Sequence, residues 1–99
     1  MMKIRIKFRK YGTMKFIGHL DVMRYFQKAI RRSEVNIRYS EGFSPHQIMS
    51  FAAPLGVGIT SKGEYVDIEV LDTENSKKMI DRLNAVMSEG FEILEYKLL

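Results

Sequence analysis

Hydrophobic and polar residues alternate one by one along several stretches of the chain, which is the pattern of half-buried β-strands. In Met2–Arg9 the even positions are hydrophobic and the odd positions are Lys or Arg. Glu64–Val70 and Val35–Tyr39 alternate in the same way, Ile48–Ala52 has the length of a short strand, and Phe91–Leu98 closes the chain as a last strand. Because successive side chains of a strand point to opposite sides, Met2–Arg9 is expected to have one core side and one basic side.

Two other stretches show the three- and four-residue spacing of amphipathic helices. The first runs from about Gly18 to Arg32 and has a basic solvent side. Its expected apolar stripe consists of Leu20, Met23, Phe26, Ala29 and Ile30. The second runs from Ser76 to Ser88, with Asn75 or Ser76 as its N-cap and Gly90 at its end. Its expected buried side consists of Met79, Ile80, Leu83, Val86 and Met87.

The order of these elements is β-α-β-β-α-β, which predicts a single α+β domain over residues 1–99 with a ferredoxin-like fold. In that fold a four-stranded antiparallel sheet carries two helices on one face, and the first strand lies in the middle. The basic side of the first strand would then lie beside Tyr65, Asp67 and Glu69 on the uncovered face. Between the elements, the Gly, Ser and Pro residues of Ser40–His46 predict a loop, and Pro54–Gly63 predicts a flexible connection or irregular hairpin.

The composition excludes several classes of protein. With 45% hydrophobic and 28% charged residues, the chain is globular and not disordered. It has no cysteine, which rules out a disulfide framework, a thiolate nucleophile and a Cys-based zinc site. Charged residues interrupt the start of the chain, unlike a signal peptide, and no hydrophobic run is long enough to span a membrane. We therefore expect a soluble cytoplasmic protein that does not act at a membrane.

The net charge of +4 hides a basic half and an acidic half. Residues 1–50 contain eleven Lys or Arg against three acids, a balance of +8, whereas residues 51–99 contain five against nine, a balance of −4. Such asymmetry is compatible with a phosphate-binding surface. It is equally compatible with two halves that neutralise each other in the folded protein. A continuous basic patch would favour the first interpretation, and a neutralised sheet face would favour the second.

If the basic half binds nucleic acid, its cations are the candidate phosphate contacts, namely Lys3, Arg5, Lys7, Arg9, Arg31, Arg32 and Arg38. The loop beside them would provide selectivity through Tyr39, Ser40, Glu41, Gly42, Phe43, Ser44, Pro45 and His46. Tyrosine and phenylalanine residues among the cations are typical of RNA-binding surfaces. The first strand has only charged residues on its open side, however, so the domain is not an ordinary RNA recognition motif.

The chemistry of catalysis is poorly represented. The two histidines are His19, at the start of the first helix beside Asp21, and His46, at the end of the loop. His19 and Asp21 form a candidate polar site, but no phosphate-binding, dinucleotide-binding, metalloprotease or nucleophile-elbow motif is present. We therefore expect no catalytic residues, no cofactor and no metal ion.

Several segments resemble one family closely. Phe16-Ile17-Gly18-His19-Leu20-Asp21 and Tyr39-Ser40-Glu41-Gly42-Phe43-Ser44-Pro45-His46 are the most specific, and the likeness covers nearly the whole chain. The chain is similar to the radical SAM-linked proteins, a bacterial family of unknown function whose members are fused to radical SAM enzymes or encoded beside them and near ribonuclease E/G. The resemblance implies an accessory role and suggests that these 99 residues correspond to the N-terminal half of longer members. Where members often have a basic residue after the Pro-His pair, this chain has Gln47, which weakens any phosphate contact by the loop.

Three functions follow from these observations. The leading hypothesis is a non-catalytic module that binds structured RNA and serves a radical SAM or ribonuclease partner. The second is a protein-docking domain that presents its loop to a radical SAM enzyme. The third is an enzyme that uses His19 and His46.

Overall fold

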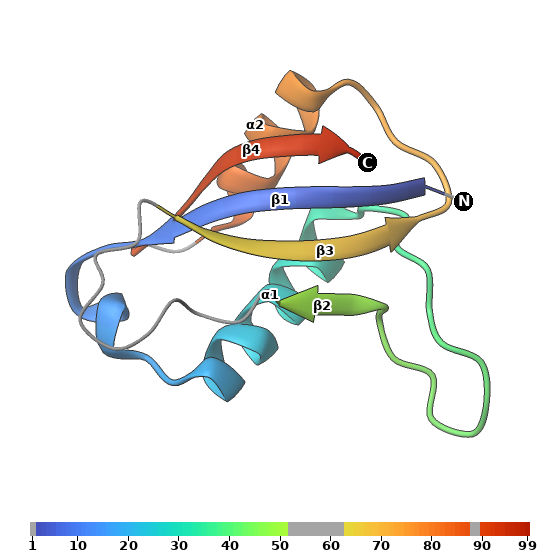
Figure 1. Ribbon diagram of the computed structural model, residues 1–99, viewed down its shortest axis with the longest axis horizontal. Helices are drawn as coiled ribbons and strands as arrows, with labels where there is room; N and C mark the ends of the chain where they lie inside the picture. Colours follow the sequence, from blue (N-terminus) through green and yellow to red (C-terminus); the bar gives the residue numbers. More distant parts are fainter. Residues whose placement is uncertain (1, 52–62, 88–89) are drawn as a thin grey trace.

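The computed structural model describes residues 2–51, 63–87 and 90–99, with only the backbone of Lys15 and His19 (Figure 1). The strands are β1 (Met2–Lys10), β2 (Met49–Phe51), β3 (Glu64–Val70) and β4 (Phe91–Leu98). The helices are α1 (His19–Ser33) and α2 (Ser76–Val86), and a 3₁₀ helix, η1 (Gly12–Phe16), follows β1. The predicted Pro54–Gly63 connection lies outside the described residues except for Gly63, as do the predicted ends of β2 at Ala52 and of α2 at Ser88.

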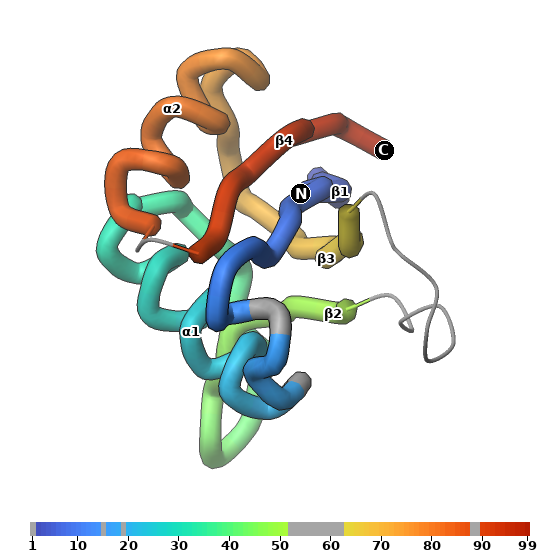
Figure 2. The backbone as a smooth tube through the Cα atoms, turned by 90° about the vertical axis from the view of Figure 1, so that its left-hand side faces the viewer, coloured from blue at the N-terminus to red at the C-terminus, as the bar shows by residue number. Residues whose placement is uncertain are grey.

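The strands form one antiparallel sheet in the order β2-β3-β1-β4. Both helices cover the same face of this sheet, and no described helix or strand covers the other face, which we call the open face (Figure 2). The predicted α+β class, element order and ferredoxin-like arrangement are confirmed. Within the central pair, Lys3 lies opposite Glu69, Arg5 opposite Asp67 and Lys7 opposite Tyr65. The predicted neighbours on the open face are therefore the observed ones.

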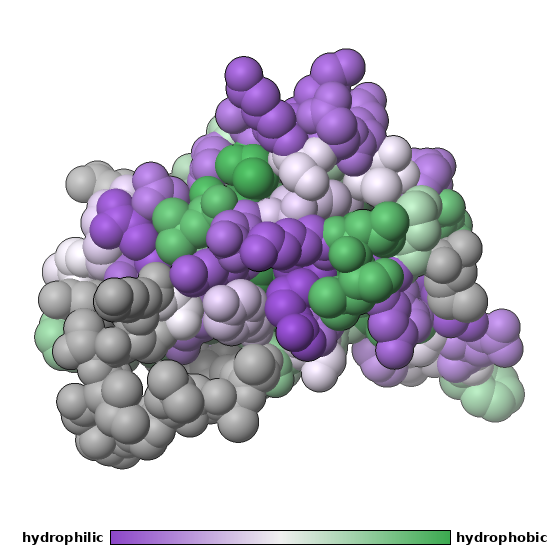
Figure 3. Space-filling model, turned by 45° about the horizontal axis from the view of Figure 1, so that its top comes forward, coloured by the Kyte–Doolittle hydropathy of each residue, from purple (hydrophilic) through white to green (hydrophobic). Residues whose placement is uncertain are grey.

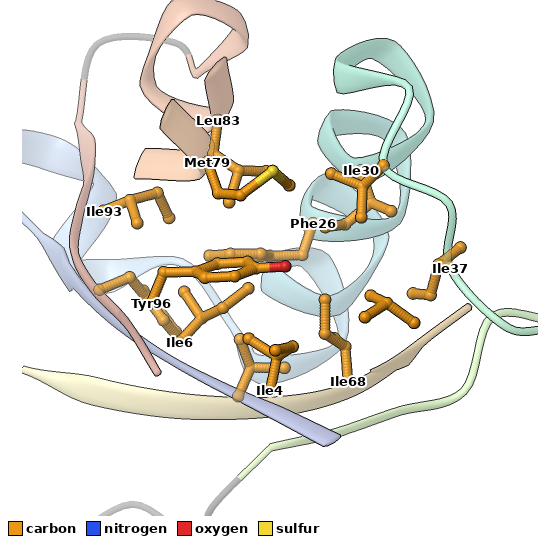
Figure 4. Packing of buried hydrophobic residues seen from close by; sticks show 14 of the residues in the cluster. Ile4, Ile6, Phe26, Ile30, Ile37, Ile68, Met79, Leu83, Ile93 and Tyr96 are labelled. Atoms are coloured by element: carbon orange, nitrogen blue, oxygen red, sulfur yellow. The ribbon is translucent and has the colours of Figure 1, made fainter. Parts of the chain in front are cut away.

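The core lies between the sheet and the helices. There Ile4, Ile6 and Phe8 of β1 meet Phe26 and Ile30 of α1 and Met79 and Leu83 of α2 (Figure 4). Phe26 is fully buried and contacts the rings of Phe8, Tyr25, Phe51 and Phe91. Burial of a large apolar side chain contributes about 2–3 kcal/mol. The core therefore fixes α1 over the sheet and determines which of its sides faces solvent.

The predicted strand Val35–Tyr39 is wrong as a regular strand. This segment forms two isolated bridges to different partners, Ile37 to Val70 and Tyr39 to Gln47. The side chains of Val35 and Ile37 are buried, as their alternation predicted. The segment pairs with the end of β3 and then with the far side of its own loop, so no continuous ladder forms, and β2 begins only at Met49.

The predicted apolar stripe of α1 is wrong at Leu20, which is 56% exposed. The buried positions are instead Val22, Phe26, Ala29, Ile30 and Ser33. At 100° per residue, Leu20 lies on the opposite side of the helix from this set. The sequence spacing of Leu20 fitted a stripe, but the packing against the sheet selected a different phase.

The start of α2 agrees with its predicted signal, whereas the predicted end at Gly90 does not, because α2 ends at Val86 with Met87 as an extended C-cap. The side chain of Asn75 accepts a hydrogen bond from the N–H of Lys78 at 2.9 Å, so Asn75 is the N-cap. Gly90 has φ +107° and lies against Met14, so that any β-carbon at this position would collide with that side chain. No helix within the described part of the chain is long and apolar enough to cross a membrane.

Candidate functional site

Two arginines on the open face of the sheet are paired with acids. The guanidinium of Arg5 donates two hydrogen bonds to Asp67, at 2.8 and 2.9 Å, and Arg9 donates to Glu92 at 2.6 Å. The hydrogen bond to Asp67 and the charge of this carboxylate raise the pKa of Arg5 above its ordinary value. Both arginines were candidate phosphate contacts, and both already have an anionic partner.

The other predicted contacts on this face are also occupied or scattered. Arg38 lies 3.2 Å from Glu69, and the ammonium of Lys7 lies 6.0 Å from the centre of the Tyr65 ring. Lys3 is exposed and lies opposite Glu69 in the register. Figure 3 shows mostly hydrophilic side chains on this side of the molecule, with smaller groups of hydrophobic ones between them. Among the described residues, the face thus carries charges of both signs and no continuous basic patch.

The outer face of α1 differs. Arg24, Lys28, Arg31 and Arg32 are all exposed and fall within one side of the helix, opposite the buried set. Among residues 2–51, 63–87 and 90–99, no ion pair involves any of these four side chains. We call these four residues the α1 basic row. Arg24 and Lys28 were not among the candidate contacts, although their spacing from Arg31 and Arg32 was visible in the sequence.

A residue from the second helix fixes the end of this row. Arg82 of α2 donates hydrogen bonds to the backbone carbonyls of Ser33 at 2.8 Å and Glu34 at 2.9 Å. These carbonyls belong to the last turn of α1, where helices leave acceptors unsatisfied. Glu34 then ends the helix in the left-handed conformation, with φ +59°. The bonds from Arg82 hold the turn that carries Arg31 and Arg32 against α2.

The loop that was expected to provide selectivity, Tyr39–His46, protrudes beside β2 (Figure 1). Ser40 and His46 close it: the N–H of Ser40 donates to the carbonyl of His46 at 2.8 Å, and the N–H of His46 donates to Ser40 Oγ at 3.1 Å. Gln47 is 5% exposed and donates to the carbonyl of Gln27 in α1 at 3.1 Å. Because the side chain of Gln47 points into the protein, it is an anchor for the loop and not a ligand contact.

The candidate polar site is not assembled into a constellation. His19 begins α1 and only its backbone is described, while Asp21 is exposed in the first turn. About 12 Å of helix separates His19 from Gln27, to which the loop is bonded. Within the described residues no group of three or more His, Asp or Glu could hold a metal ion.

A recess in the described part of the chain has no histidine or carboxylate in its lining. It has a volume of about 370 Å³ and is lined by Tyr11, Gly12, Thr13, Met14 and Gly90. Tyr11 is the only titratable residue in this lining, so the recess offers no acid–base pair for catalysis.

The sequence profile of a family described as an uncharacterized protein conserved in bacteria (DUF2344) matches residues 3–99. Because the match extends over nearly the whole chain, the protein belongs to this family. Neither a curated protein nor a solved structure matches it.

Proposed function

We propose that this member of an uncharacterised bacterial family is an accessory module that binds structured RNA through the α1 basic row. The radical SAM enzyme or ribonuclease E/G to which the sequence resemblance points is the protein that such a module would serve. The proposal assigns the RNA to the helix layer instead of the sheet, because Arg5, Arg9 and Arg38 already have acidic partners.

The observation that carries the proposal is the set of cations on one face of α1 that have no ion pair among the described residues. A phosphate that approaches Arg5 competes with Asp67 for the guanidinium, whereas no carboxylate of the described residues pairs with Lys28. Release of condensed counterions is what drives Lys and Arg onto nucleic acids. Asp21 lies near the start of the same face, so the positive charge is concentrated from Arg24 onward.

The geometry of the row favours a folded RNA over a flexible single strand. From Arg24 to Arg32 the row extends about 12 Å along the helix axis, which is enough to contact two or three phosphates of one strand. The α1 basic row contains no aromatic side chain, and the nearby Tyr25 ring is already stacked on Phe91, with ring centres 4.3 Å apart. Binding to single strands relies on stacking of bases, whereas duplex RNA is recognised by its backbone and shape.

The proposal is tested by the salt dependence of binding to a fluorescein-labelled RNA hairpin, measured by fluorescence anisotropy. A module that neutralises about three phosphates of a duplex should give a log–log slope of about −3, at about 0.9 per phosphate. Replacing Arg31 and Arg32 with Ala should flatten the slope by about half.

The matched control replaces Arg5 and Arg9 with Ala, which removes the same charge from the sheet face and should leave the slope unchanged. An unstructured oligonucleotide of equal length should bind more weakly than the hairpin. Absence of binding at low salt, or equal flattening by the two double variants, would overturn the proposal.

A further inference from the structure

The two sides of the loop Ser40–His46, residues 38–40 and 46–48, are joined by backbone hydrogen bonds. Arg38 and Ile48 are joined by a backbone hydrogen bond of 2.9 Å, and Ser40 and His46 by one of 2.8 Å. The ring Nδ1 of His46 lies 3.1 Å from Ser40 Oγ and 3.2 Å from the carbonyl of Ser44. These bonds define the backbone on both sides of a short tip, from Glu41 to Pro45.

The tip presents an aromatic side chain to solvent. Gly42 adopts φ +114°, which side chains rarely allow, and the next residue, Phe43, has an exposed fraction of 108%, as full as in an extended chain. A single exposed apolar residue is common on protein surfaces. Phe43 differs because the two sides of its loop are hydrogen-bonded to each other and, through Gln47, to α1.

The charges of the loop indicate which partner it fits. No Lys or Arg lies between Tyr39 and Ile48, and Glu41 adds a negative charge beside Phe43. The nearest cation along the chain, Arg38, is paired with Glu69. A phosphate backbone would be repelled at this tip, whereas an apolar pocket with a Lys or Arg at its rim would be complementary to both Phe43 and Glu41.

We propose that Phe43 is an anchor that inserts into an apolar pocket of a second, different protein, with Glu41 facing a cation at the rim of that pocket. The loop is pre-organised, so docking orders few additional bonds, which is the condition under which one buried aromatic contributes strongly to affinity. The site is separate from the α1 basic row, so the domain would hold RNA on one surface and its protein partner on another.

The experiment places the photo-crosslinker p-benzoylphenylalanine at position 43 of the full chain in its native cells. The same crosslinker at Phe16, which is 86% exposed on η1, is the control. We expect one protein adduct from position 43, mapped to an apolar pocket with a neighbouring Lys or Arg, and none from position 16. Adducts to nucleic acid, to lipid or to a second copy of this chain, or no adduct, would overturn the proposal.

The captured protein is then purified and titrated with variants of the domain by calorimetry. Phe43→Ala should weaken binding by about 30-fold or more, and Glu41→Gln by about threefold at low salt. Phe43→Leu should retain much of the affinity, because an apolar pocket accepts it, whereas a stacking site would require Tyr or Trp. The proposal fails if Phe43→Ala binds as tightly as the wild type, or if Leu fails where Tyr succeeds.

Replacement of Arg31 and Arg32 with Ala separates this inference from the proposed RNA function. The double variant should bind the captured protein with unchanged affinity, even as its RNA binding weakens. If both Phe43→Ala and the double arginine variant weakened the two partners equally, one shared surface would replace the two surfaces proposed here.

Discussion

On the open face of the sheet, Arg5 and Arg9 each lie within 2.8 Å of a carboxylate, whereas on the outer face of α1 four cations have no ion pair among the described residues. Both groups come from the same basic half of the chain. The acids on the sheet are 62 and 83 residues away in sequence, and strand pairing brings them into position. None of the described elements packs over the outer side of α1, where the α1 basic row is exposed.

The net charge of a segment in the sequence therefore does not show how much of that charge a ligand can contact in the folded protein. In the sheet, neighbouring strands place acids from residues 64–95 opposite the bases of β1. In the helix, the four-residue spacing places Arg24 near Lys28 and Lys28 near Arg32, and like charges at this spacing repel. Added salt should therefore weaken the pairs on the sheet and relieve the repulsion on α1.

Both surfaces depend on one core, and its disruption should have the largest effect. Phe26→Ala is expected to lower the free energy of unfolding by about 3–5 kcal/mol, because Phe26 contacts rings on β1, β2 and β4. Urea unfolding followed by circular dichroism measures this loss. Phe16→Ala, at an exposed position, should change stability by less than about 0.5 kcal/mol. Similar values for the two variants would contradict the assignment of the core.

On the sheet, Glu69→Gln should lower stability by up to about 1 kcal/mol at low salt, because it removes the charge that faces Arg38 in a partly exposed pair. The loss should shrink at about 1 M salt, where charges more than about 3 Å apart are screened. Urea unfolding at both salt concentrations provides the measurement, with Glu74→Gln in the exposed segment before α2 as the control. A loss that persists at high salt would mean that the side chain acts through packing.

On α1 a charge change should have the opposite sign. Lys28→Glu places a carboxylate between Arg24 and Arg32 at four-residue spacing, so stability should rise by about 0.5 kcal/mol. The same change should weaken binding to the RNA hairpin, because it divides the α1 basic row. Thermal unfolding and anisotropy measure the two effects. A decrease in stability would show that Lys28 already has a favourable partner and would break the contrast between the two faces.

The smallest expected effect comes from the ionisation of Tyr96, a buried residue of the core. Burial raises the pKa of Tyr96 above its ordinary value of about 10, and its hydroxyl lies 2.7 Å from Thr73 Oγ1. Below pH 10 the tyrosine is neutral in both folded and unfolded chains. Above pH 10 the unfolded chain loses a proton that the folded protein retains, so stability should fall as pH rises further.

Tyr96→Phe should remove this part of the alkaline decline, as measured by urea unfolding at pH 8 and about pH 10.5. Tyr65→Phe, on the exposed face, should leave the decline intact. Equal behaviour of the two variants would contradict the effect of burial at Tyr96.

The local features of this protein follow from its sequence. Alternation in Met2–Arg9 and Glu64–Val70 determined which side chains face the core, and Asn75 determined where α2 begins. The placement of Lys3, Arg5 and Lys7 beside Tyr65, Asp67 and Glu69 also follows, once the element order indicates a ferredoxin-like sheet. These features are predictable because side-chain direction is set residue by residue by the backbone period.

Other features were decided only by the tertiary structure. The pairing of Arg9 with Glu92 depends on the irregular register between β1 and β4. The pairing of Arg38 with Glu69 depends on a segment that did not form a regular strand. The exposure of Leu20 depends on which side of α1 packs against the sheet. The closure of the loop by Ser40 and His46 also required the two sides of the loop to lie next to each other. Each depends on which distant segment lies opposite a residue, and local periodicity carries no information about which segment that is. For this reason the sequence named Arg5, Arg31 and Arg32 alike as candidate contacts. Only the fold separated Arg5, which is paired with Asp67, from Arg31 and Arg32, which have no ion pair among the described residues.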